Sequence, residues 1–534
     1  MDPSSNVHPF AGRRRRARRI AAAVVGTLAA LLVTALPVSA QTVDGWPQFQ
    51  GGPDHTGVAA DGPAPGYSVD WTLAVAPGGP GDQYGLSAPV SVGDLIVAVG
   101  PEAVIGVDAT AGTQAWSVDR DLGPSVPAAI TSIGGRDAVV YTEGFGDGPP
   151  DAAGSASPSA SASGSASPSS SDGATQDERF DSHLAAFDLD TQKPLWDPVA
   201  LSAVSRTGVT VGDGMAYLGV NGGTIYAVDL AKGKVAWTAE LGRPVATQPA
   251  FTDGTVVVGL QASRQEPHPT VVALEASTGE ERWRADDESQ AAIVSTASIA
   301  DGTVYVAFTG GQESSIDAFA LDTGGRRWRT RFPRFFDLTA TTPPVVTDDA
   351  VYVTDAQGET YRLDPATGTR TWEFALNEGV LRTSPIAVGD HVLVGTIDGS
   401  LVALEASGGD LVWRDDGDGS PLRALAVAGD RVIAVRAGAG AGLVAFVHDD
   451  GVALVREVSP TTLNLGLLLG AFAVAALVVA GIVLLAGRVL AGRIGPAFPN
   501  GEDPLEGDLD DDEDEEDEDD GGDPAQDDDD EDDR

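Results

Sequence analysis

The side chains that could carry chemistry in this chain are mostly carboxylates. The 534 residues include 79 Asp and Glu against 33 Lys and Arg, which gives a formal net charge of -46 at pH 7. The six histidines are isolated, and none stands in a His-Glu-x-x-His or similar metal-ligand spacing. Cysteine is absent, which excludes disulfides, thiolate metal sites and cysteine nucleophiles. No Gly-x-Ser-x-Gly elbow occurs either. We therefore predict no catalytic residue and no metal site, and the acidic charge excludes a nucleic-acid partner.

Many of the carboxylates recur at a fixed distance from tryptophan. Tryptophans from Trp116 to Trp413 follow one another at intervals of 41 to 46 residues, apart from one interval of 80. Asp or Glu stands eight residues before each, with Ala320 as the exception, and Gly stands four residues before each, with Gln192 as the exception. Such a carboxylate can accept backbone N–H groups at a turn, the Gly can adopt a positive φ, and the Trp then opens the next strand. The period thus assigns these acids to turns and not to acid–base catalysis.

The repeat predicts an all-β fold. A Gly-Asp or Asp-Gly turn such as Asp253-Gly254 precedes a β-rich run in each repeat, so that roughly 43 residues hold four short strands. This is the composition of a β-propeller blade. We predict a propeller of four-stranded antiparallel blades over residues 41–458, with eight blades, or seven as the alternative. A degenerate last repeat runs from Ser420 to about Val458, with Val455 at the tryptophan position. The strand around Trp71 is left over and is expected to pair with the last blade.

The recurring residues have one structural role in this interpretation. Equivalent tryptophans in every repeat indicate packing between neighbouring blades, whereas stacking on a cofactor or a sugar would need one special Trp. The blade-packing residues are Trp71, Trp116, Trp196, Trp237, Trp283, Trp328, Trp372 and Trp413. The turn residues are Asp108, Gly112, Asp229, Gly233, Gly279, Gly324, Asp364, Gly368 and Gly409.

The irregular interval of 80 residues contains a low-complexity stretch. Residues 144–180 are rich in Ser, Ala, Pro and Gly, a composition typical of flexible linkers. Removal of these 37 residues leaves an interval of 43. We predict a disordered loop insertion that leaves the array of blades continuous.

Both ends of the chain predict a membrane topology. Residues 1–40 combine an arginine cluster, an apolar run and a small-residue cleavage pattern, which indicates a signal peptide or an uncleaved signal anchor. Residues 463–487 hold a 23-residue apolar run, long enough for one transmembrane helix. Arg488 and Arg493 follow it, so the positive-inside rule places the C-terminus in the cytoplasm and the propeller outside. Residues 488–534 form an acidic tail, unbroken from Asp510 to Asp520, which we predict to be disordered.

The repeats resemble those of the pyrroloquinoline-quinone-like propeller family. The resemblance rests on segments such as Tyr226-Ala-Val-Asp-Leu-Ala-Lys-Gly-Lys-Val-Ala-Trp237 and on the opening Trp46-Pro-Gln-Phe-Gln-Gly-Gly-Pro-Asp-His-Thr-Gly57. It covers roughly residues 46–458 and is specific for architecture more than for activity.

Two branches of this family carry different expectations. The quinoprotein dehydrogenases use pyrroloquinoline quinone and Ca²⁺ in the central funnel, often against a vicinal disulfide that this chain cannot form. The other branch, similar to the BamB propeller lipoprotein that supports outer-membrane β-barrel assembly, is not catalytic. This chain departs from that branch as well, because it lacks a lipobox Cys and has a predicted C-terminal span.

We expect a non-catalytic, membrane-tethered scaffold or ligand-binding module of the cell envelope, with protein partners or a small ligand and no cofactor. A membrane-bound quinoprotein alcohol or sugar dehydrogenase with quinone and Ca²⁺ is the alternative, and a ligand sensor that signals through the tail is another. One basic, aromatic stretch is a candidate contact patch for an anionic polymer or a protein, with a solvated blade strand as the simpler explanation. Its basic residues are Arg326, Arg327, Arg329, Arg331 and Arg334.

Overall fold

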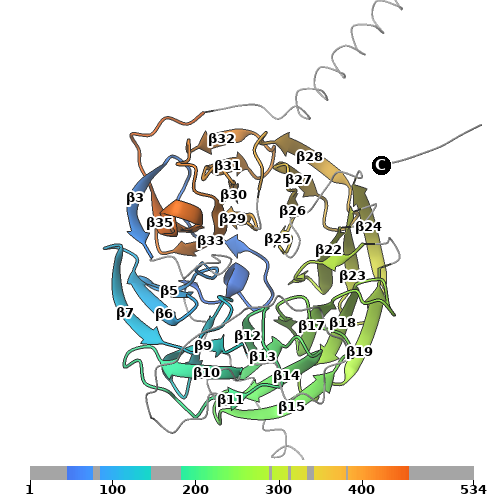
Figure 1. Cartoon of the computed structure of the whole chain (residues 1–534). Helices are drawn as coiled ribbons and strands as arrows, with labels where there is room; N and C mark the ends of the chain where they lie inside the picture. Colours follow the sequence, from blue (N-terminus) through green and yellow to red (C-terminus); the bar gives the residue numbers. More distant parts are fainter. Residues whose placement is uncertain are drawn as a thin grey trace, which may run out of the picture. The chain divides into compact units, whose positions relative to one another are not determined.

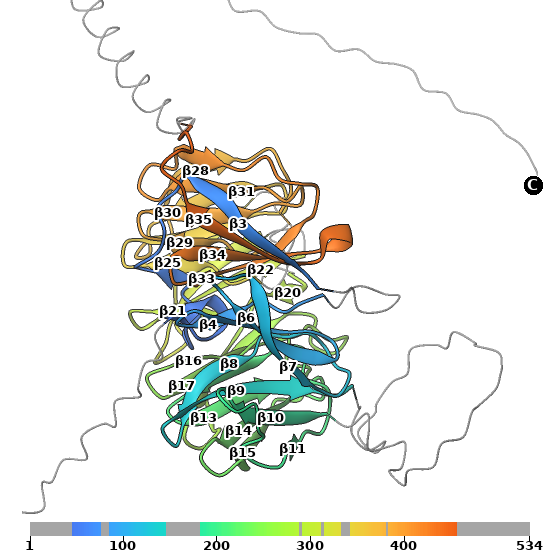
Figure 2. The same ribbon diagram turned by 90° about the vertical axis from the view of Figure 1, so that its left-hand side faces the viewer.

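A computed structural model describes residues 45–75, 85–145, 182–287, 291–310, 314–332, 342–380 and 383–455. They all belong to one compact unit within residues 1–467. Their strands form eight sheets, which Figure 1 shows arranged as a ring around a central axis and Figure 2 shows from the side. The prediction of an all-β, eight-bladed propeller is therefore confirmed, and the seven-bladed alternative is wrong.

The first four blades follow one another along the chain. Blade 1 holds β4 (Val90–Val92), β5 (Leu95–Val99), β6 (Ala103–Asp108) and β7 (Thr113–Asp119). Blade 2 holds β8 (Ala129–Ile133), β9 (Arg136–Glu143), β10 (His183–Asp188) and β11 (Val199–Ala200). Blade 3 holds β12 (Val209–Gly212), β13 (Met215–Gly219), β14 (Thr224–Asp229) and β15 (Lys234–Glu240). Blade 4 holds β16 (Ala250–Thr252), β17 (Thr255–Leu260), β18 (Thr270–Glu275) and β19 (Glu281–Asp286).

The remaining blades complete the ring. Blade 5 holds β20 (Ile293–Val294) and β21 (Ser298–Ala300), both paired with β22 (Thr303–Thr309), then β23 (Ser314–Ala320) and β24 (Arg326–Phe332). Blade 6 holds β25 (Val345–Thr347), β26 (Ala350–Thr354), β27 (Glu359–Leu363) and β28 (Arg370–Ala375). Blade 7 holds β29 (Ile386–Val388), β30 (His391–Gly395), β31 (Leu401–Glu405) and β32 (Leu411–Arg414). Blade 8 holds β33 (Leu422–Ala428), β34 (Arg431–Arg436), β35 (Gly442–His448) and β3 (Tyr67–Ala74), with the short η3 (Gly438–Gly440) before β35.

The two ends of the propeller meet in blade 8. Strand β3 pairs antiparallel with β35 from Tyr67↔His448 to Ala74↔Gly442, and Figure 1 shows the blue N-terminal strand beside the orange C-terminal one. The leftover strand therefore closes the ring, as predicted. Trp71 lies on β3 and occupies the outer strand of this blade, so the assignment of Val455 to the tryptophan position is wrong. Val455 is 53% exposed and its N–H bonds to the carbonyl of Val412 in blade 7 instead.

Residues 45–59 form a lead-in segment that runs through the centre of the ring. It comprises β1 (Gly45–Trp46), η1 (Phe49–Gly51) and β2 (Val58–Ala59), and η1 is the short helical turn at the middle of Figure 1. The innermost strands of blades 2, 4, 5, 6 and 7 each donate a backbone N–H to one of its carbonyls. These bonds are Ile130 to Pro47, Phe251 to Pro53, Ile299 to Asp54, Val346 to Thr56 and Ala387 to Gly57, at 2.7–2.9 Å. The side chain of Gln48 bonds Val211 of blade 3, and Trp46 N–H bonds Ser91 Oγ of blade 1.

Tryptophans on the outer strands, and Trp196 just before β11, contact the following blade. The indole N–H of Trp283 donates to Leu321 O at 2.7 Å, and a Cβ on Gly324 would lie 2.6 Å from the ring. Five more tryptophans make the same bond to the next blade, with the turn Gly against the ring. These are Trp71 to Ala109, Trp196 to Leu230, Trp237 to Ala276, Trp328 to Pro365 and Trp372 to Ala406, at 2.8–3.2 Å. We call this indole–turn contact the blade staple.

The turn grammar has a direct structural basis. Asp108 Oδ1 accepts the N–H groups of Thr110 and Ala111, and Gly112 has a φ of 65° while its N–H bonds the carbonyl of Asp108. Gln192, the exception to the Gly rule, also has a positive φ of 53°. The Trp does not open its strand as expected, because the strand begins one or two residues after the turn Gly, and Trp116 is the fourth residue of β7.

Two blade junctions depart from the staple. Within the described ranges, the indole N–H groups of Trp116 (blades 1 and 2) and Trp413 (blades 7 and 8) form no hydrogen bond. Trp116 packs edge-on against Phe187, with ring centroids 5.5 Å apart, and Trp413 packs edge-on against Tyr67 at 5.1 Å. Both departures have a local cause, because the turn after Trp116 carries Gln192 and the outer strand after Trp413 comes from the N-terminus.

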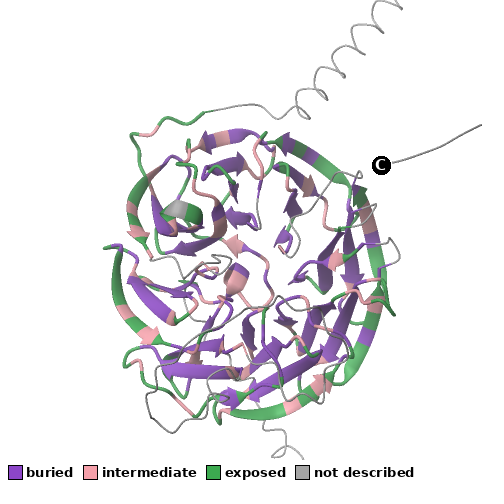
Figure 3. Ribbon diagram, viewed as in Figure 1, coloured by how far each residue is buried: buried purple, intermediate pink, exposed green. Residues whose placement is uncertain are grey.

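The hydrophobic core lies between the blades and not at the centre. Figure 3 shows the inner and middle strands buried and the outer strands alternating between exposed and buried residues. The middle strands, such as β17 with Thr255–Leu260 buried throughout, are covered by neighbouring blades on both faces. Outer strands are more exposed, and in β7 only Trp116 and Val118 are partly buried, as expected for a strand with one solvated face.

The predicted terminal segments lie outside the described residues. Residues 1–40, 463–487 and 488–534 are not described, nor are residues 146–181 of the insertion that follows β9. In the ranges that are described, no helix is both long and apolar enough to cross a membrane.

His55 is the most enclosed titratable group of the lead-in segment. Its side chain is fully buried, its Nε2 lies 3.3 Å from Thr210 Oγ1, and its carbonyl accepts a bond from Ser298 Oγ. Burial lowers the pKa of His55 to about 3, so the ring is uncharged in the folded protein at neutral pH.

Substitution of a turn Gly by Ala tests the blade staple. Gly324 and Gly302 both have a positive φ, but a Cβ meets the Trp283 ring at Gly324 and meets nothing within 4 Å at Gly302. We expect Gly302→Ala to lower the free energy of unfolding by about 1 kcal/mol, from backbone strain alone. Gly324→Ala should cost about 1–3 kcal/mol more, from the overlap with the indole. Denaturant unfolding of the full-length chain measures both, and equal losses would contradict the staple.

The buried His55 makes stability depend on pH. The folded pKa is depressed, so the contribution of the neutral ring is fully present above the ordinary value of 6.5 and is lost as the pH falls from there towards about 3. Between about pH 7 and about pH 5, the wild type should lose about 2 kcal/mol more unfolding free energy than His55→Gln. The measurement compares how steeply the unfolding free energy of the wild type and of His55→Gln changes with pH. The loss of packing in His55→Gln lowers the unfolding free energy equally at both pH values and does not change this slope. Parallel slopes would show that His55 is not the group that titrates.

Candidate functional site

Two cavities lie at opposite ends of the central channel. The larger, about 1040 Å³, is lined by residues that end or follow the innermost strands of blades 4–7, such as Asp253 and Asp301. The smaller, about 280 Å³, is lined mainly by residues that precede the innermost strands, such as Thr207 and Ser384. The lead-in segment contributes Asp54 to the first and Gln50 to the second, and therefore lies between them.

The larger cavity is strongly acidic, and we call it the acidic cavity. No Lys or Arg is among its described lining residues. Burial raises the pKa of Asp54, whereas Asp253, Asp301 and Asp390 are exposed at turns. The carboxylates that line it are Asp54, Asp253, Asp301, Asp348, Asp349, Asp390 and Glu405. Only one set of three metal-type donors within 4.8 Å of one another occurs in the described chain, and it lies elsewhere. The acidic cavity thus offers a spread of negative charge suited to an extended cationic partner more than to one ion.

The smaller cavity is polar and carries positive charge, and we call it the polar cavity. Arg206 and Arg423 line it together with Gln248, Ser384 and Gln50. Ser384 Oγ and Gln50 Oε1 are buried and have no hydrogen-bond partner in the described structure. Unpaired buried polar groups are costly, and here they lie beside two cations. This arrangement suits a small anionic ligand with hydrogen-bonding groups.

The channel does not fit the quinone and calcium of the quinoprotein branch. Ca²⁺ takes six to eight oxygen ligands, which include Asp or Glu carboxylates beside carbonyls and waters. The described lining of the polar cavity contains no carboxylate, because its charged residues are Arg206 and Arg423. The carboxylates line the other end, and the lead-in segment, bonded to the innermost strands, separates the two. An anion-binding group and a calcium ligand set are therefore not brought together in the described channel.

The arginine stretch lies on the outer strand of blade 5 and is largely paired within the blade. Arg329 contacts Asp287 at 2.7 Å and Asp317 at 2.8 Å, and both carboxylates are fully buried. Arg326 contacts Asp317 at 2.8 Å, and Arg327 bonds Gly302 O at 3.1 Å. Arg331 lies on the same strand, and Arg334 lies outside the described residues. The guanidinium groups of Arg326 and Arg329 are thus committed to internal ion pairs.

Sequence reasoning did not identify either cavity. The carboxylates of the acidic cavity come from turns in different repeats and from the lead-in segment, so that no local motif groups them. A signal for part of it was present, because Asp-Gly and Gly-Asp turns recur in successive repeats, and equivalent turns of a ring must lie on one face.

Comparisons with known proteins agree with the geometry. A model of the family described as outer membrane protein assembly factor BamB matches residues 181–318 and 312–487. The outer membrane protein assembly factor BamB of Yersinia pestis is 25% identical over 247 residues, 43% of this chain and 60% of that protein. That of Bordetella pertussis is 26% identical over 362 residues, 64% of this chain and 89% of that protein.

A structural likeness extends to an enzyme. A europium-containing methanol dehydrogenase superposes with a TM-score of 0.53 at 13% identity, covering 73% of this chain and 89% of that one. At this identity the likeness shows a shared fold alone. The family match spans more than half of the residues and runs from β10 in blade 2 to β35 in blade 8. On this basis the chain belongs to the family of the outer membrane protein assembly factor BamB.

Proposed function

We propose that this propeller is a non-catalytic binding module of the cell envelope that holds a partner protein at its acidic cavity. The observation that carries the proposal is the occupied channel, in which the lead-in segment bonds the innermost strands of seven blades. Because the lead-in segment fills the channel, a partner is expected to bind at the two ends of the propeller and not inside the channel. The family supports the same role, since its relatives are named as assembly factors.

The chemistry of the partner follows from the charge of the cavity. Seven carboxylates line a cavity of about 1040 Å³ without a cation among the described lining residues. Such a concave acidic surface focuses its field and attracts a basic segment at long range. The partner would therefore present Lys and Arg, and its binding would weaken as the salt concentration rises.

The tether of the module rests on the sequence. The apolar run within residues 463–487 would hold the propeller at the outer surface of the membrane, with the acidic tail in the cytoplasm. Tethering restricts the propeller to a thin layer next to the membrane, which raises its effective concentration towards membrane-bound partners.

In-cell cross-linking of the full-length chain tests the docking face. A photo-reactive residue at Ser407, which lines the acidic cavity, should yield a discrete adduct with an envelope protein. The same residue at Ser117, on the exposed outer strand β7, should not. The triple variant Asp253→Asn, Asp301→Asn, Asp390→Asn should lower the adduct yield at least tenfold, because these three exposed carboxylates lie at the cavity.

A charge-matched variant provides the control. Asp137→Asn, Asp190→Asn, Asp197→Asn removes the same charge from exposed positions of blade 2 and should keep the adduct. Adducts that form equally from Ser117, or that disappear equally in both triple variants, would contradict docking at the acidic cavity.

A quinone-dependent dehydrogenase is the alternative activity. The polar cavity favours it, since the quinone is an anion and Arg206 and Arg423 line this cavity. The full-length protein, incubated with pyrroloquinoline quinone and Ca²⁺ and then desalted, should show no dye reduction with alcohols or sugars. The physical reason is that the described polar cavity supplies no carboxylate for calcium. Stoichiometric retention of the quinone together with dye reduction would replace the scaffold proposal by an enzyme.

A further inference from the structure

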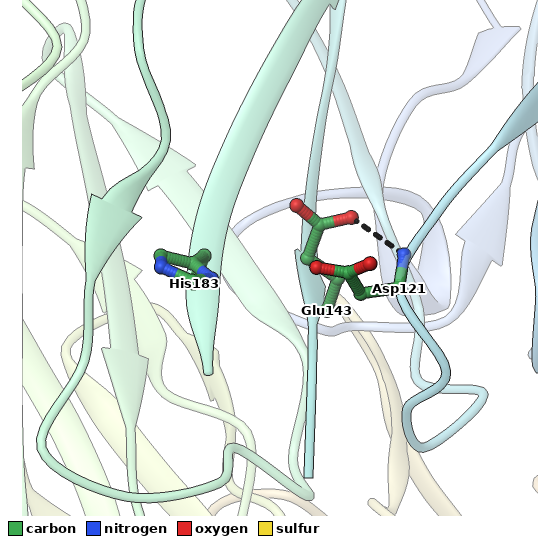
Figure 4. A group of neighbouring side chains, drawn as sticks. All are labelled: Asp121, Glu143 and His183. Carbon is green, nitrogen blue, oxygen red and sulfur yellow. Dashed lines mark hydrogen bonds between the residues drawn. The ribbon is translucent and has the colours of Figure 1, made fainter. Parts of the chain in front are cut away.

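Three metal-type side chains meet at the junction of blades 1 and 2. Asp121 follows β7 of blade 1, Glu143 ends β9 and His183 begins β10 of blade 2. One carboxylate oxygen from each acid and one imidazole nitrogen all lie within 4.8 Å of one another. Figure 4 shows the two carboxylates and the imidazole side by side.

The fold positions the three side chains independently of any ion. His183 and Glu143 are direct partners in the antiparallel ladder of β9 and β10, so their side chains share one face of the sheet. The backbone N–H of Asp121 donates to Glu143 Oε2 at 3.1 Å, which holds the connection from blade 1 against blade 2. All three residues are partly buried.

The donor atoms are available for a ligand. Neither the imidazole of His183 nor the carboxylate of Asp121 forms a hydrogen bond or an ion pair within the described residues. A cavity of about 390 Å³ adjoins the cluster and is lined by Asp121, Glu143 and Arg120. Arg120 is only 7% exposed, and its Nη1 is bonded to the carbonyls of Gly100 and Pro124 and not to either carboxylate.

We propose that Asp121, Glu143 and His183 bind one divalent transition-metal ion, with Zn²⁺ as the reference ion. Two carboxylate oxygens and one imidazole nitrogen are a mixed donor set that suits Zn²⁺ or Mn²⁺ better than Ca²⁺ or Mg²⁺, which take oxygen ligands. Three protein ligands leave at least one coordination position for water, and the adjoining cavity has room for it. Zinc at ~2.1 Å from each donor places the donors ~3.4 Å apart, so no two donors need to approach each other by more than ~1.4 Å on binding.

The ion would lie at one of the two junctions that lack the staple hydrogen bond. Blades 1 and 2 lack the staple hydrogen bond, because Trp116 packs against Phe187 and donates to no carbonyl within the described ranges. A metal ion held by Asp121 on one side and by Glu143 and His183 on the other links these two blades directly. The cluster is thus a metal-dependent substitute for the missing indole contact.

Metal titration of the chelator-treated full-length chain tests the site. A millimolar excess of Mg²⁺ saturates the hard carboxylate sites, including the acidic tail, before Zn²⁺ is added. We expect one Zn²⁺ site per chain and a higher unfolding temperature in its presence. Asp121→Asn, Glu143→Gln and His183→Gln should each weaken Zn²⁺ binding at least tenfold. Asp119→Asn, an exposed position two residues from Asp121 with the same charge change, should leave it unchanged.

A cysteine variant identifies the ligand spectroscopically. The chain contains no cysteine, so His183→Cys introduces a single thiol. With Co²⁺ as the probe, this variant should show a thiolate-to-metal absorption band that the wild type lacks. Absence of a stoichiometric Zn²⁺ site in the wild type would overturn the proposal. A second outcome would also overturn it: Zn²⁺ affinity that is equal in the three ligand variants and in Asp119→Asn. The comparison uses variants whose metal-free forms unfold at the same temperature.

Discussion

The ring depends on hydrogen-bond partners for the backbone groups along the inner edge of each innermost strand. The innermost strand of each blade has no further strand of that blade beside it on the channel side. Its buried backbone N–H groups need other partners, because leaving them unpaired is costly. The lead-in segment meets this constraint with its own carbonyls, which accept bonds from Ile130, Phe251, Ile299, Val346 and Ala387 in turn. Because a single segment of about 15 residues visits seven blades, it both fills the channel and determines the relative position of the blades around it.

At the periphery of the ring, neighbouring blades are joined by the blade staple. At six junctions an indole N–H reaches the carbonyl of the residue after the turn position of the following blade, and the turn Gly lies against the ring. That turn position holds a carboxylate at five of these junctions and Ala320 at the sixth. Each staple needs a Trp in one repeat and a Gly in the next, which explains why the repeats share these two residues. The carboxylate serves the same turn by capping backbone N–H groups, as Asp108 and Asp364 do. The three residue types therefore form one interblade unit.

The occupied channel also separates charge. Turns that follow the innermost strands collect Asp253, Asp301 and Asp390 at one end of the channel. At the other end lie Arg206, which precedes β12, and Arg423, near the start of β33. A continuous funnel would let these groups act on one ligand, but the lead-in segment lies between them. This separation supports recognition of a cationic partner at one face and gives no common site for an anionic cofactor and its metal.

The sequence by itself determined the class of fold, the period of the repeat and the strand that closes the ring, whereas the choice between eight and seven blades came from the structure. These properties follow from a period, and a period is local: Trp, Gly and carboxylate at constant offsets report a unit that recurs whatever surrounds it. The period was less informative for blade 8, whose outer strand comes from the N-terminus. Val455 was placed on that outer strand because the spacing of the repeats does not show that β3 already occupies it.

Only the tertiary structure decided the sites. Glu143 and His183 are separated in the chain by the Ser- and Ala-rich insertion, and Asp121 comes from another blade, so their proximity arises from the register of β9 and β10 and the junction of two blades. The acidic cavity likewise collects side chains from four blades and the lead-in segment. Local spacing cannot report such groupings, because they depend on which repeats become neighbours when the ring closes.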